Sequence, residues 1–243
     1  MKRFFVNHGL GKDFDLTGTE HNHLTNVLRT KTGEHVVVCC DDEYDYIYEA
    51  VKITKNSTQM RFIQHKPNTA NPKIELDVFM ALIKPDNINL VMQKLNELGV
   101  SVLTLFNSAH AQQKMITRDK IDVFSERLRK IAEQSSKQCR RSIPLFFHDI
   151  LTFDEMCDCA KNSDLVIFAD ETETDTKIAN LNIKPDKNIS LIIGPEGGFT
   201  EIERRQIRAM KNIVSVSLGK RILRTETATI AASAIILSKL GEL

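Results

Sequence analysis

The sequence predicts an α/β protein made of two domains, and three observations support this fold class. Short β-type runs separated by polar turns fill the first seventy residues, whereas strand-length apolar runs alternate with amphipathic helical patterns from Ile74 onward. Between them, Lys66–Lys73 reads KPNTANPK, with two prolines and no large apolar residue, as expected of a linker. The length of 243 residues suits one large domain or two smaller ones. We therefore predict domains over residues 1–68 and 73–243.

The smaller domain is expected to be a small β-barrel or sandwich, because its strand candidates are short and regularly spaced. The candidate strands are Arg3–Val6, His35–Cys40, Tyr46–Ile53 and Thr58–Ile63. One short helix is predicted over His21–Arg29, with Leu24, Val27 and Leu28 on its inner face. Nine basic residues balance nine acidic ones over residues 1–70, so this domain as a whole is not a general polyanion binder. Arg29 could still belong to a local basic patch, or be an ordinary solvated charge.

The larger domain is predicted to contain a mostly parallel sheet, because strand and helix candidates alternate along it. The candidate strands are Glu75–Ile83, Val102–Phe106, Asp164–Ala169, Leu191–Gly194 and Asn212–Leu218. The candidate long helices are Asn87–Gly99, Thr117–Gln138 and Glu226–Gly241, and Thr225 is expected to cap the last of them. Two shorter helices are expected to begin at the capping boxes Thr152–Glu155 and Thr200–Glu203.

Composition excludes several classes of protein. The five cysteines form no CxxC pair and the histidines lack ligand spacing, so neither a disulfide framework nor a metal site is predicted. The amino-terminal residues lack the apolar region of a signal peptide, and no apolar run is long enough to span a membrane. We expect a cytoplasmic location. The formal net charge of +1 says nothing about a partner, so any nucleic-acid surface has to come from local clustering.

The strongest local cluster of positive charge surrounds the predicted helix Thr117–Gln138. Residues 114–141 hold nine lysines and arginines against four acidic residues. One interpretation is a solvated helix face with pairs four residues apart, such as Glu126 with Lys130. The last part, Lys137–Arg141, is predicted to lack acidic partners, which favours contact with phosphate groups there.

Two segments carry the strongest functional signal. Ser190–Glu203 reads SLIIGPEGGFTEIE and Ser217–Ala228 reads SLGKRILRTETA. In each, an apolar strand candidate ends in a turn that leads into a helix, and such turns lie beyond the carboxyl ends of strands, where α/β sheets bind ligands. Glycines allow close approach of the backbone, and the basic residues of the second turn indicate an anionic ligand. Neither GK[ST] nor GxGxxG occurs, so the common nucleotide-binding motifs are absent.

Together with RFF near the start, HLTNVLR (His23–Arg29), QKLNELGV (Gln93–Val100) and KIAEQSSKQCRR (Lys130–Arg141), these two segments give the chain a family resemblance. It resembles the RsmE-type 16S ribosomal RNA uridine-N3 methyltransferases of the SPOUT (α/β-knot) superfamily. The resemblance implies a PUA-like RNA-binding β-barrel followed by a trefoil-knotted α/β domain. It also implies S-adenosylmethionine (SAM) as methyl donor, 16S rRNA in the small ribosomal subunit as substrate, and a homodimer.

The resemblance also implies roles for individual residues. Arg224 is expected to stabilise the uridine anion, and Glu226 or Glu196 to accept its proton; Glu226 could instead only complement the helix dipole. The expected cofactor residues are Ala169, Gly194, Pro195, Glu196, Gly198, Leu218, Gly219, Ile222, Leu223 and Thr227. The expected RNA contacts are Arg29, Arg140 and Arg141.

Two alternatives stay open at this point. The chain could be a methyltransferase of the same fold that acts on transfer RNA or on another nucleoside. It could also be a non-catalytic RNA-binding or assembly protein that keeps the pocket as a scaffold. The sequence departs from the family pattern at Pro85 and at Lys137, which stands where a glutamate is common, and these departures concern the RNA contacts more than the pocket.

Overall fold

The computed structural model describes residues 1–6, 11–111, 118–184 and 188–243. The chain divides into two units, Met1–Asn71 with Glu133–Pro144, and Pro72–Ala132 with Leu145–Leu243. The break between Asn71 and Pro72 falls inside the segment predicted to be the linker. The assignment of Glu133–Pro144 to the first unit differs from the predicted range of 73–243 for the larger domain, and a set of polar contacts explains the difference.

Side-chain contacts tie Glu133–Pro144 to the first unit. Lys137 makes an ion pair with Glu20 at 3.0 Å. The Asn71 amide donates to the Ser142 hydroxyl at 2.8 Å, and that hydroxyl donates to the backbone carbonyl of Asp42 at 2.6 Å. The partners of each pair are far apart in the sequence, so no local pattern could have predicted this arrangement.

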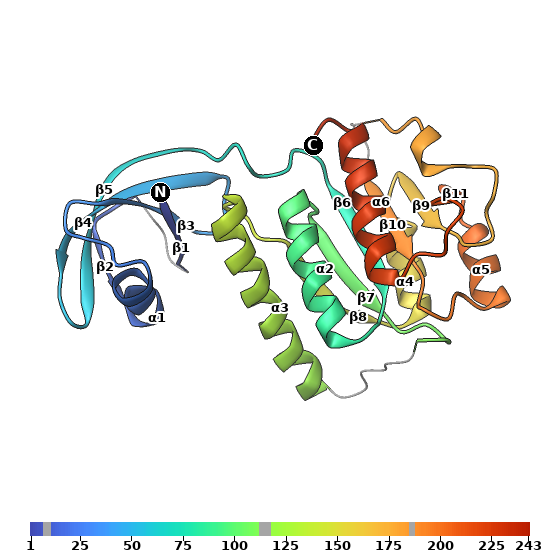
Figure 1. Cartoon of the computed structure of the whole chain (residues 1–243), viewed down its shortest axis with the longest axis horizontal. Helices are drawn as coiled ribbons and strands as arrows, with labels where there is room; N and C mark the ends of the chain where they lie inside the picture. Colours follow the sequence, from blue (N-terminus) through green and yellow to red (C-terminus); the bar gives the residue numbers. More distant parts are fainter. Residues whose placement is uncertain (7–10, 112–117, 185–187) are drawn as a thin grey trace. The chain divides into compact units, whose positions relative to one another are not determined.

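The first unit contains a curled five-stranded sheet in the order β1-β3-β4-β5-β2 (Figure 1). Its strands are β1 (Lys2–Phe5), β2 (Phe14–Thr17), β3 (His35–Cys39), β4 (Tyr44–Ile53) and β5 (Ser57–Pro67). β1 pairs with β3 in parallel, and the other neighbours are antiparallel. β2 was not predicted, because its four residues include only two apolar side chains.

The predicted helix His21–Arg29 is shifted and irregular. The α-helix α1 covers Gly18–Asn22 and continues as a π-helical turn, η1, over His23–Val27. Leu24 is fully buried in the core of this unit, as predicted. Val27 is 67% exposed, so its placement on the inner face was wrong. The wider π-type turn rotates this position away from where α-helical spacing puts it.

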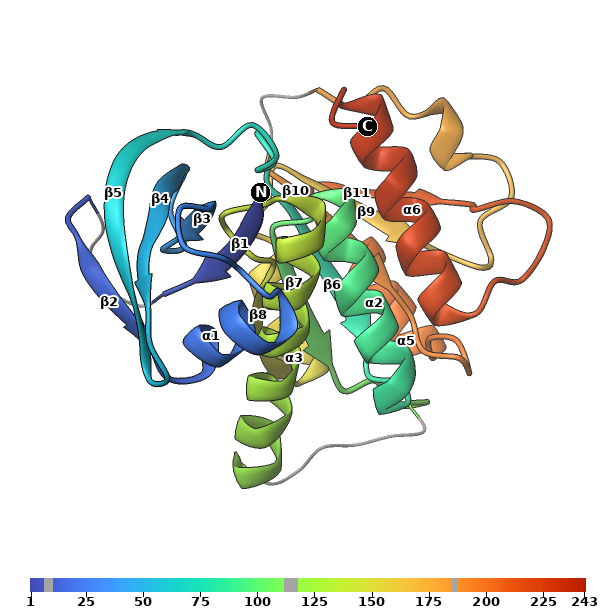
Figure 2. The same ribbon diagram turned by 60° about the vertical axis from the view of Figure 1, so that its left-hand side comes forward.

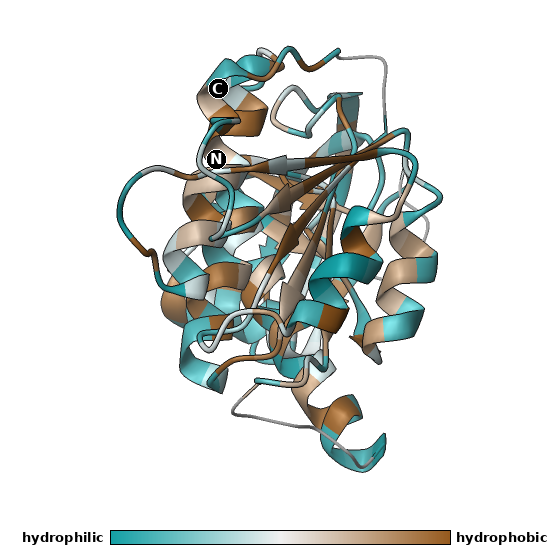
Figure 3. Ribbon diagram, turned by 90° about the vertical axis from the view of Figure 1, so that its right-hand side faces the viewer, coloured by the Kyte–Doolittle hydropathy of each residue, from teal (hydrophilic) through white to brown (hydrophobic). Residues whose placement is uncertain are grey.

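The second unit is built on a six-stranded parallel sheet in the order β11-β9-β10-β6-β7-β8. Its strands are β6 (Leu76–Ala81), β7 (Val102–Phe106), β8 (Phe146–Leu151), β9 (Leu165–Ala169), β10 (Ile189–Ile193) and β11 (Ile213–Val216). The interior strands are apolar, as is typical of a parallel sheet covered on both faces (Figure 3). The edge strand β8 was not predicted, because Phe146 and His148 are exposed and the strand lacks a continuous buried run.

Helices pack on both faces of this sheet (Figure 2). On one face, α2 (Pro85–Leu98), the first part of α3 (Arg118–Cys139) and α6 (Thr225–Lys239) form the larger apolar cluster. On the other, α4 (Phe153–Ala160) and α5 (Glu201–Arg208) form a second cluster. Gly99 ends α2 in the left-handed conformation, as predicted. Within the described residues, no helix is both long and apolar enough to cross a membrane.

Candidate functional site

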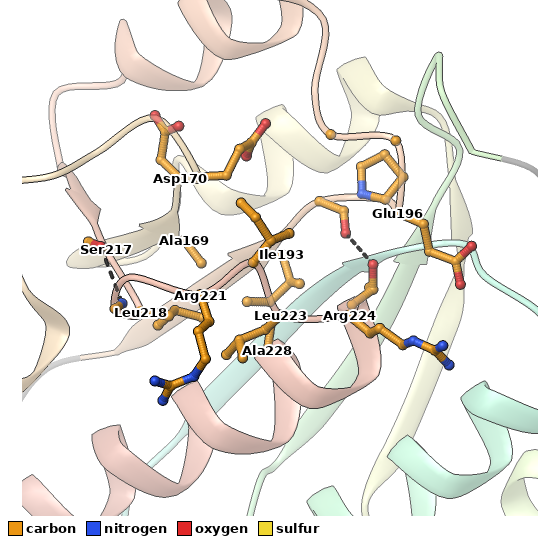
Figure 4. A pocket seen from close by; sticks show the side chains of 18 of the residues that line it. Ala169, Asp170, Ile193, Glu196, Ser217, Leu218, Arg221, Leu223, Arg224 and Ala228 are labelled. Carbon is orange, nitrogen blue, oxygen red and sulfur yellow. Dashed lines mark hydrogen bonds between the residues drawn. The ribbon is translucent and has the colours of Figure 1, made fainter.

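A cavity of about 640 Å³ lies at the carboxyl ends of β9, β10 and β11 (Figure 4). This position follows the rule for open α/β sheets, and the volume is in the range of small-molecule sites. The lining residues are Lys84, Ala169, Asp170, Glu171, Ile193, Gly194, Pro195, Glu196, Gly197, Gly198, Val216, Ser217, Leu218, Gly219, Arg221, Ile222, Leu223, Arg224, Thr225 and Ala228.

The first wall is the turn between β10 and α5. The Gly198 amide donates to the Pro195 carbonyl at 2.9 Å, and Gly198 adopts a φ of 71°. The positive φ favours glycine at this position, and a Cβ atom there would also push aside the Glu171 carboxylate, whose Oε1 would lie 2.6 Å from it. Thr200 and Glu203 form the predicted capping box that starts α5.

The second wall is the loop that follows β11, and a hydrogen bond joins it to the first. The Thr225 hydroxyl donates to the Gly194 carbonyl at 3.0 Å (Figure 4). Thr225 had been predicted to cap α6, and this was wrong: Arg224 is the N-cap residue, and Thr225 is the first helical residue. The hydroxyl therefore links the two turns that the sequence had marked separately.

The third wall is acidic and follows β9. Asp170 is 2% exposed and accepts hydrogen bonds from Arg208 and from the backbone and hydroxyl of Thr172. Glu171 accepts from Arg204 at 2.6 Å and keeps its carboxylate beside Gly198. The sequence prediction for this site missed both carboxylates. Their position directly after a buried strand was the signal that could have indicated them.

The loop after β7 braces the first wall from behind. The Glu203 carboxylate accepts from the Ser108 hydroxyl and from the Ala109 amide, both at 2.9 Å. Burial raises the pKa of Glu203, but hydrogen bonds from the Ala109 and Thr200 amides and from hydroxyl groups outweigh burial and hold this pKa below its usual value. An imidazole nitrogen of His110 lies 3.2 Å from the Gly198 carbonyl oxygen, so the loop contacts the glycine turn directly.

Comparison with known proteins identifies the family. A family model described as an RNA methyltransferase domain matches residues 69–237. The ribosomal RNA small subunit methyltransferase E of Mesomycoplasma hyopneumoniae is 30% identical over 95% of this chain and 96% of its own length. This chain belongs to the small-subunit methyltransferase E family.

Solved structures agree with this membership. A methyltransferase of Legionella pneumophila in complex with the cofactor SAM is 25% identical, with a TM-score of 0.87 over 97% of this chain and 96% of that one. The methyltransferase E of Neisseria gonorrhoeae, bound to SAM, has the same fold, with 24% identity and a TM-score of 0.85 over 98% of this chain and 97% of that one.

Within this methyltransferase E chain, the cavity brings together most of the residues predicted to bind the cofactor. Of that set, only Thr227 does not line it, being exposed on α6. Among the predicted catalytic residues, Arg224 and Glu196 line the cavity and lie on the same side of it (Figure 4). Glu226 does not line it: this residue is 9% exposed, and its Oε2 has no hydrogen-bond partner among the described residues.

Sequence reasoning about this methyltransferase E chain also missed several lining residues. Ser217 lies where the chain leaves β11, and its amide and carbonyl bond to Thr176 and Ile178. Lys84 immediately precedes α2, in a turn that the sequence did not connect with the pocket. Arg221 had been noted only as part of a basic turn. Its side chain lies beside Leu218 in Figure 4 and on the other side of the cavity from Arg224.

The three arginines predicted to contact RNA lie in the first unit, and they differ in their exposure to solvent. Arg29 and Arg140 are exposed, and both have positive φ angles, of 49° and 72°. Arg141 is 2% exposed, and its Nε donates to the Ile143 carbonyl. Burial lowers the pKa of Arg141 to about 10. The Arg141 guanidinium is therefore not presented at the surface in this structure, and its contact with RNA stays a prediction.

The prediction that Lys137–Arg141 lacks acidic partners was also wrong, since Lys137 pairs with Glu20. Glu20 lies far from this segment in the sequence, so counting nearby charges could not reveal the pair. By contrast, Lys130 pairs with Glu126 at 3.4 Å, as the four-residue spacing predicted. The larger part of α3 thus behaves as a solvated charged helix.

Proposed function

We propose that this chain transfers the methyl group of SAM to N3 of a uridine in 16S rRNA, within the small ribosomal subunit. The observation that carries the proposal is the cavity whose two turns, Gly194–Thr200 and Ser217–Arg224, are joined by Thr225. Both turns belong to the segments that resemble the family. The relatives from M. hyopneumoniae and N. gonorrhoeae are named ribosomal RNA small subunit methyltransferases, and the second was solved with SAM.

The residues of the cavity suit SAM. The side chains of Ile193, Val216, Leu218, Leu223 and Ala228 offer an apolar surface for a purine ring. Gly197 and Gly198 line the cavity without side chains, so the backbone of this turn is open to close approach by a ligand. Acidic side chains on one wall and arginines on another suit a donor that carries both positive and negative charges.

The protein itself has two tasks: to remove the proton from uridine N3 and to align N3 with the methyl group. Bound SAM supplies an activated methyl group, so the chain has mainly to align the acceptor with it. Uridine N3 carries a proton and becomes a good nucleophile only when that proton leaves. Arg224 is exposed at the cavity and is suited to stabilise the anionic ring.

Two carboxylates compete for the role of base. Glu196 lines the cavity on the same side as Arg224 and is exposed, so it can reach a substrate without a change in the fold. Glu226 holds an unpartnered Oε2 but lies outside the lining, at the start of α6 where an acid complements the helix dipole. Glu196 is therefore our first choice. Glu196→Gln should lower kcat more than Glu226→Gln, with SAM affinity retained.

We also infer that the second unit contains a trefoil knot. The segment between β9 and β10 contacts the end of β11 through the bridge of Lys177 with Ser217. It also contacts the far end of α6, because Lys239 donates to the Leu181 carbonyl at 3.0 Å. These contacts support a path in which the carboxyl-terminal chain passes through the β9–β10 connection. The test of this topology is whether the backbone of the second unit stays knotted when its two ends are joined.

The curled sheet of the first unit supports its assignment as a PUA-like barrel, and α6 supports a homodimer. The side of α6 formed by Ile230, Ala231, Ala234 and Ile235 is apolar yet partly exposed. A helix that is apolar on all sides is usually buried, so a second copy is the natural cover. Sedimentation analysis should give a dimer mass. A cytoplasmic location follows from the ribosomal substrate.

The deciding experiment is modification of the natural substrate. Small subunits from cells lacking the protein are incubated with the chain and SAM, and nucleosides are then measured by mass spectrometry. The expected product is 3-methyluridine. Another methylated nucleoside would retire the uridine-N3 assignment, and SAM binding without turnover on ribosomal or transfer RNA would favour an assembly factor. Calorimetry without binding heat at millimolar SAM would overturn the cofactor assignment.

A further inference from the structure

A row of aromatic rings runs along β4 and β5 in the first unit, from the core to the surface. The residues are Tyr44, Tyr46 and Tyr48 on β4, and Phe62 and His65 on β5. Alternate residues of a strand share a face, and the register places Tyr46 opposite His65 and Tyr48 opposite Phe62. Tyr48 is fully buried, Tyr46 and Phe62 are half-buried, and Tyr44 is 38% exposed.

The row reaches the surface because β4 extends beyond the residues that pair with β3. β3 pairs with β4 only between Tyr46 and Glu49, so Tyr44 lies beyond the last residue that β3 covers. There Tyr44 and His65 meet edge to face, with ring centroids 5.3 Å apart. His65 also lies 5.8 Å from Tyr46 and is stacked on Phe62 at 6.4 Å.

Hydrogen bonds to Asp42 hold the Tyr46 ring and the Tyr44 backbone at the exposed end of the row. The Tyr46 hydroxyl donates to the Asp42 carboxylate at 2.9 Å, so this ring cannot reorient freely. The Tyr44 amide donates to the same carboxylate at 3.0 Å. An exposed aromatic surface that is already ordered loses little entropy when a flat ligand stacks on it.

The exposed residue Arg140 is bonded, through its backbone, near the same end of the row. Asn68 uses its side-chain amide twice, donating to Asp45 at 2.6 Å and to the Arg140 backbone carbonyl at 2.9 Å. Asp45 lies between Tyr44 and Tyr46 on β4 and faces the other side of the sheet, so this bridge places the Arg140 backbone at the end of β4 and β5 where the rings are exposed. The Arg140 side chain is exposed, and no ion pair to it occurs within the described residues.

We propose that Tyr44 and His65 form a stacking platform for an unpaired RNA base, with Arg140 positioned for the adjoining phosphate. Aromatic rings beside a cation match the two faces of a single-stranded nucleotide, a flat base and an anionic backbone. A base in a duplex is already stacked on both sides, so the platform selects unpaired RNA. This inference rests on the proposed function only in taking RNA as the substrate, and it names a site remote in sequence from both pocket turns.

The test is binding of a labelled single-stranded RNA of about ten nucleotides, a length suited to such surfaces, measured over a range of salt concentrations. Tyr44→Ala and His65→Ala should each weaken binding roughly 5- to 100-fold, the usual effect of losing one stacked base. Their salt dependence should match that of the wild-type chain, whereas Arg140→Ala should reduce the salt slope. Tyr44→Trp should bind as well as the wild type, because it keeps the ring.

Phe146→Ala is the matched control, since Phe146 is a 60% exposed aromatic side chain on β8 of the second unit. It should bind the single strand normally. Urea denaturation followed by circular dichroism checks that each variant is folded, because the SAM cavity lies in the other unit. Wild-type affinity of Tyr44→Ala and His65→Ala would overturn the platform while leaving RNA as the substrate. Absence of binding of the wild-type chain to both this RNA and small subunits would overturn the proposed function as well.

Discussion

At the scale of single residues, Thr225 matters most because it joins the two pocket turns. Its hydroxyl donates to Gly194 from a residue that is 3% exposed. Thr225→Val keeps the shape but removes the donor, leaving a buried carbonyl unpaired, which should cost about 1–3 kcal/mol of unfolding free energy. Urea denaturation measures this loss, and calorimetry should show weaker SAM binding. Thr225→Ser should restore both; unchanged SAM affinity in Thr225→Val would contradict the joining role.

The protonation state of the Asp77 carboxyl group on β6 affects stability. Burial and the neighbouring Glu75 raise the pKa of Asp77 to about 6. Because the folded pKa is raised, the carboxyl contributes stability that is complete at low pH and lost as the pH rises through about 6. Asp77→Asn should therefore raise Tm at pH 8, by about 2–4 °C after allowing for partial solvation. The gain should shrink at pH 5, and an equal gain at both pH values would refute the assignment.

At the scale of elements, the turn between β10 and α5 depends on Gly198. Gly198→Ala meets two obstacles, a φ of 71° and the Glu171 carboxylate oxygen at 2.6 Å. Gly241→Ala is the matched control, because its φ is 81° but no atom lies within 4 Å of the added Cβ. We expect Gly198→Ala to lose slightly more stability than Gly241→Ala, by about 0.5–1.5 kcal/mol, because the Glu171 side chain must shift away from its bond with Arg204, and to weaken SAM binding. Equal losses in thermal denaturation would show that the contact with Glu171 is unimportant.

The same turn is linked to the β7 loop by Glu203. Hydrogen bonds hold the pKa of Glu203 in the folded protein below its value in the unfolded chain. Ionised Glu203 therefore stabilises the fold at pH values above the unfolded-state pKa. This stabilisation is lost as the pH falls through the folded-state pKa. Glu203→Gln should lower Tm near neutral pH and flatten the acidic part of the Tm–pH curve. Asp119→Asn, at an exposed position near the start of α3, is the control. A parallel shift of the whole curve for Glu203→Gln would argue against this linkage.

At the scale of the whole molecule, the end of α3 leaves the methyltransferase unit and becomes part of the first unit. Lys137 pairs with Glu20 and lies over the Phe4 ring at 5.9 Å from its centroid. Lys137→Glu should destabilise the first unit by about 1–3 kcal/mol, because it replaces an attraction with repulsion. The Glu20→Lys, Lys137→Glu double variant should recover much of the loss in urea denaturation. Additive losses would mean that the two side chains do not interact.

Features that depend on neighbours along the chain could be predicted from the amino-acid sequence. The linker composition around Pro67 and Pro72, the capping box of Thr200 and Glu203, and the glycine that ends α2 are short-range signals. The two motif turns were recognisable for the same reason, and they provided most of the cavity. A turn needs particular residue types at fixed spacing, whatever the rest of the fold does.

Contacts between residues far apart in the sequence could not be predicted and are seen only in the folded chain. Folding joined Thr225 to Gly194, brought Asp170 and Glu171 to the pocket, and paired Lys137 with Glu20. It also buried Arg141, which charge alone had suggested for RNA. The physical reason is that burial and pairing depend on which surfaces the fold brings together, and a charged side chain has the same local sequence signal whether it is solvated, paired or buried.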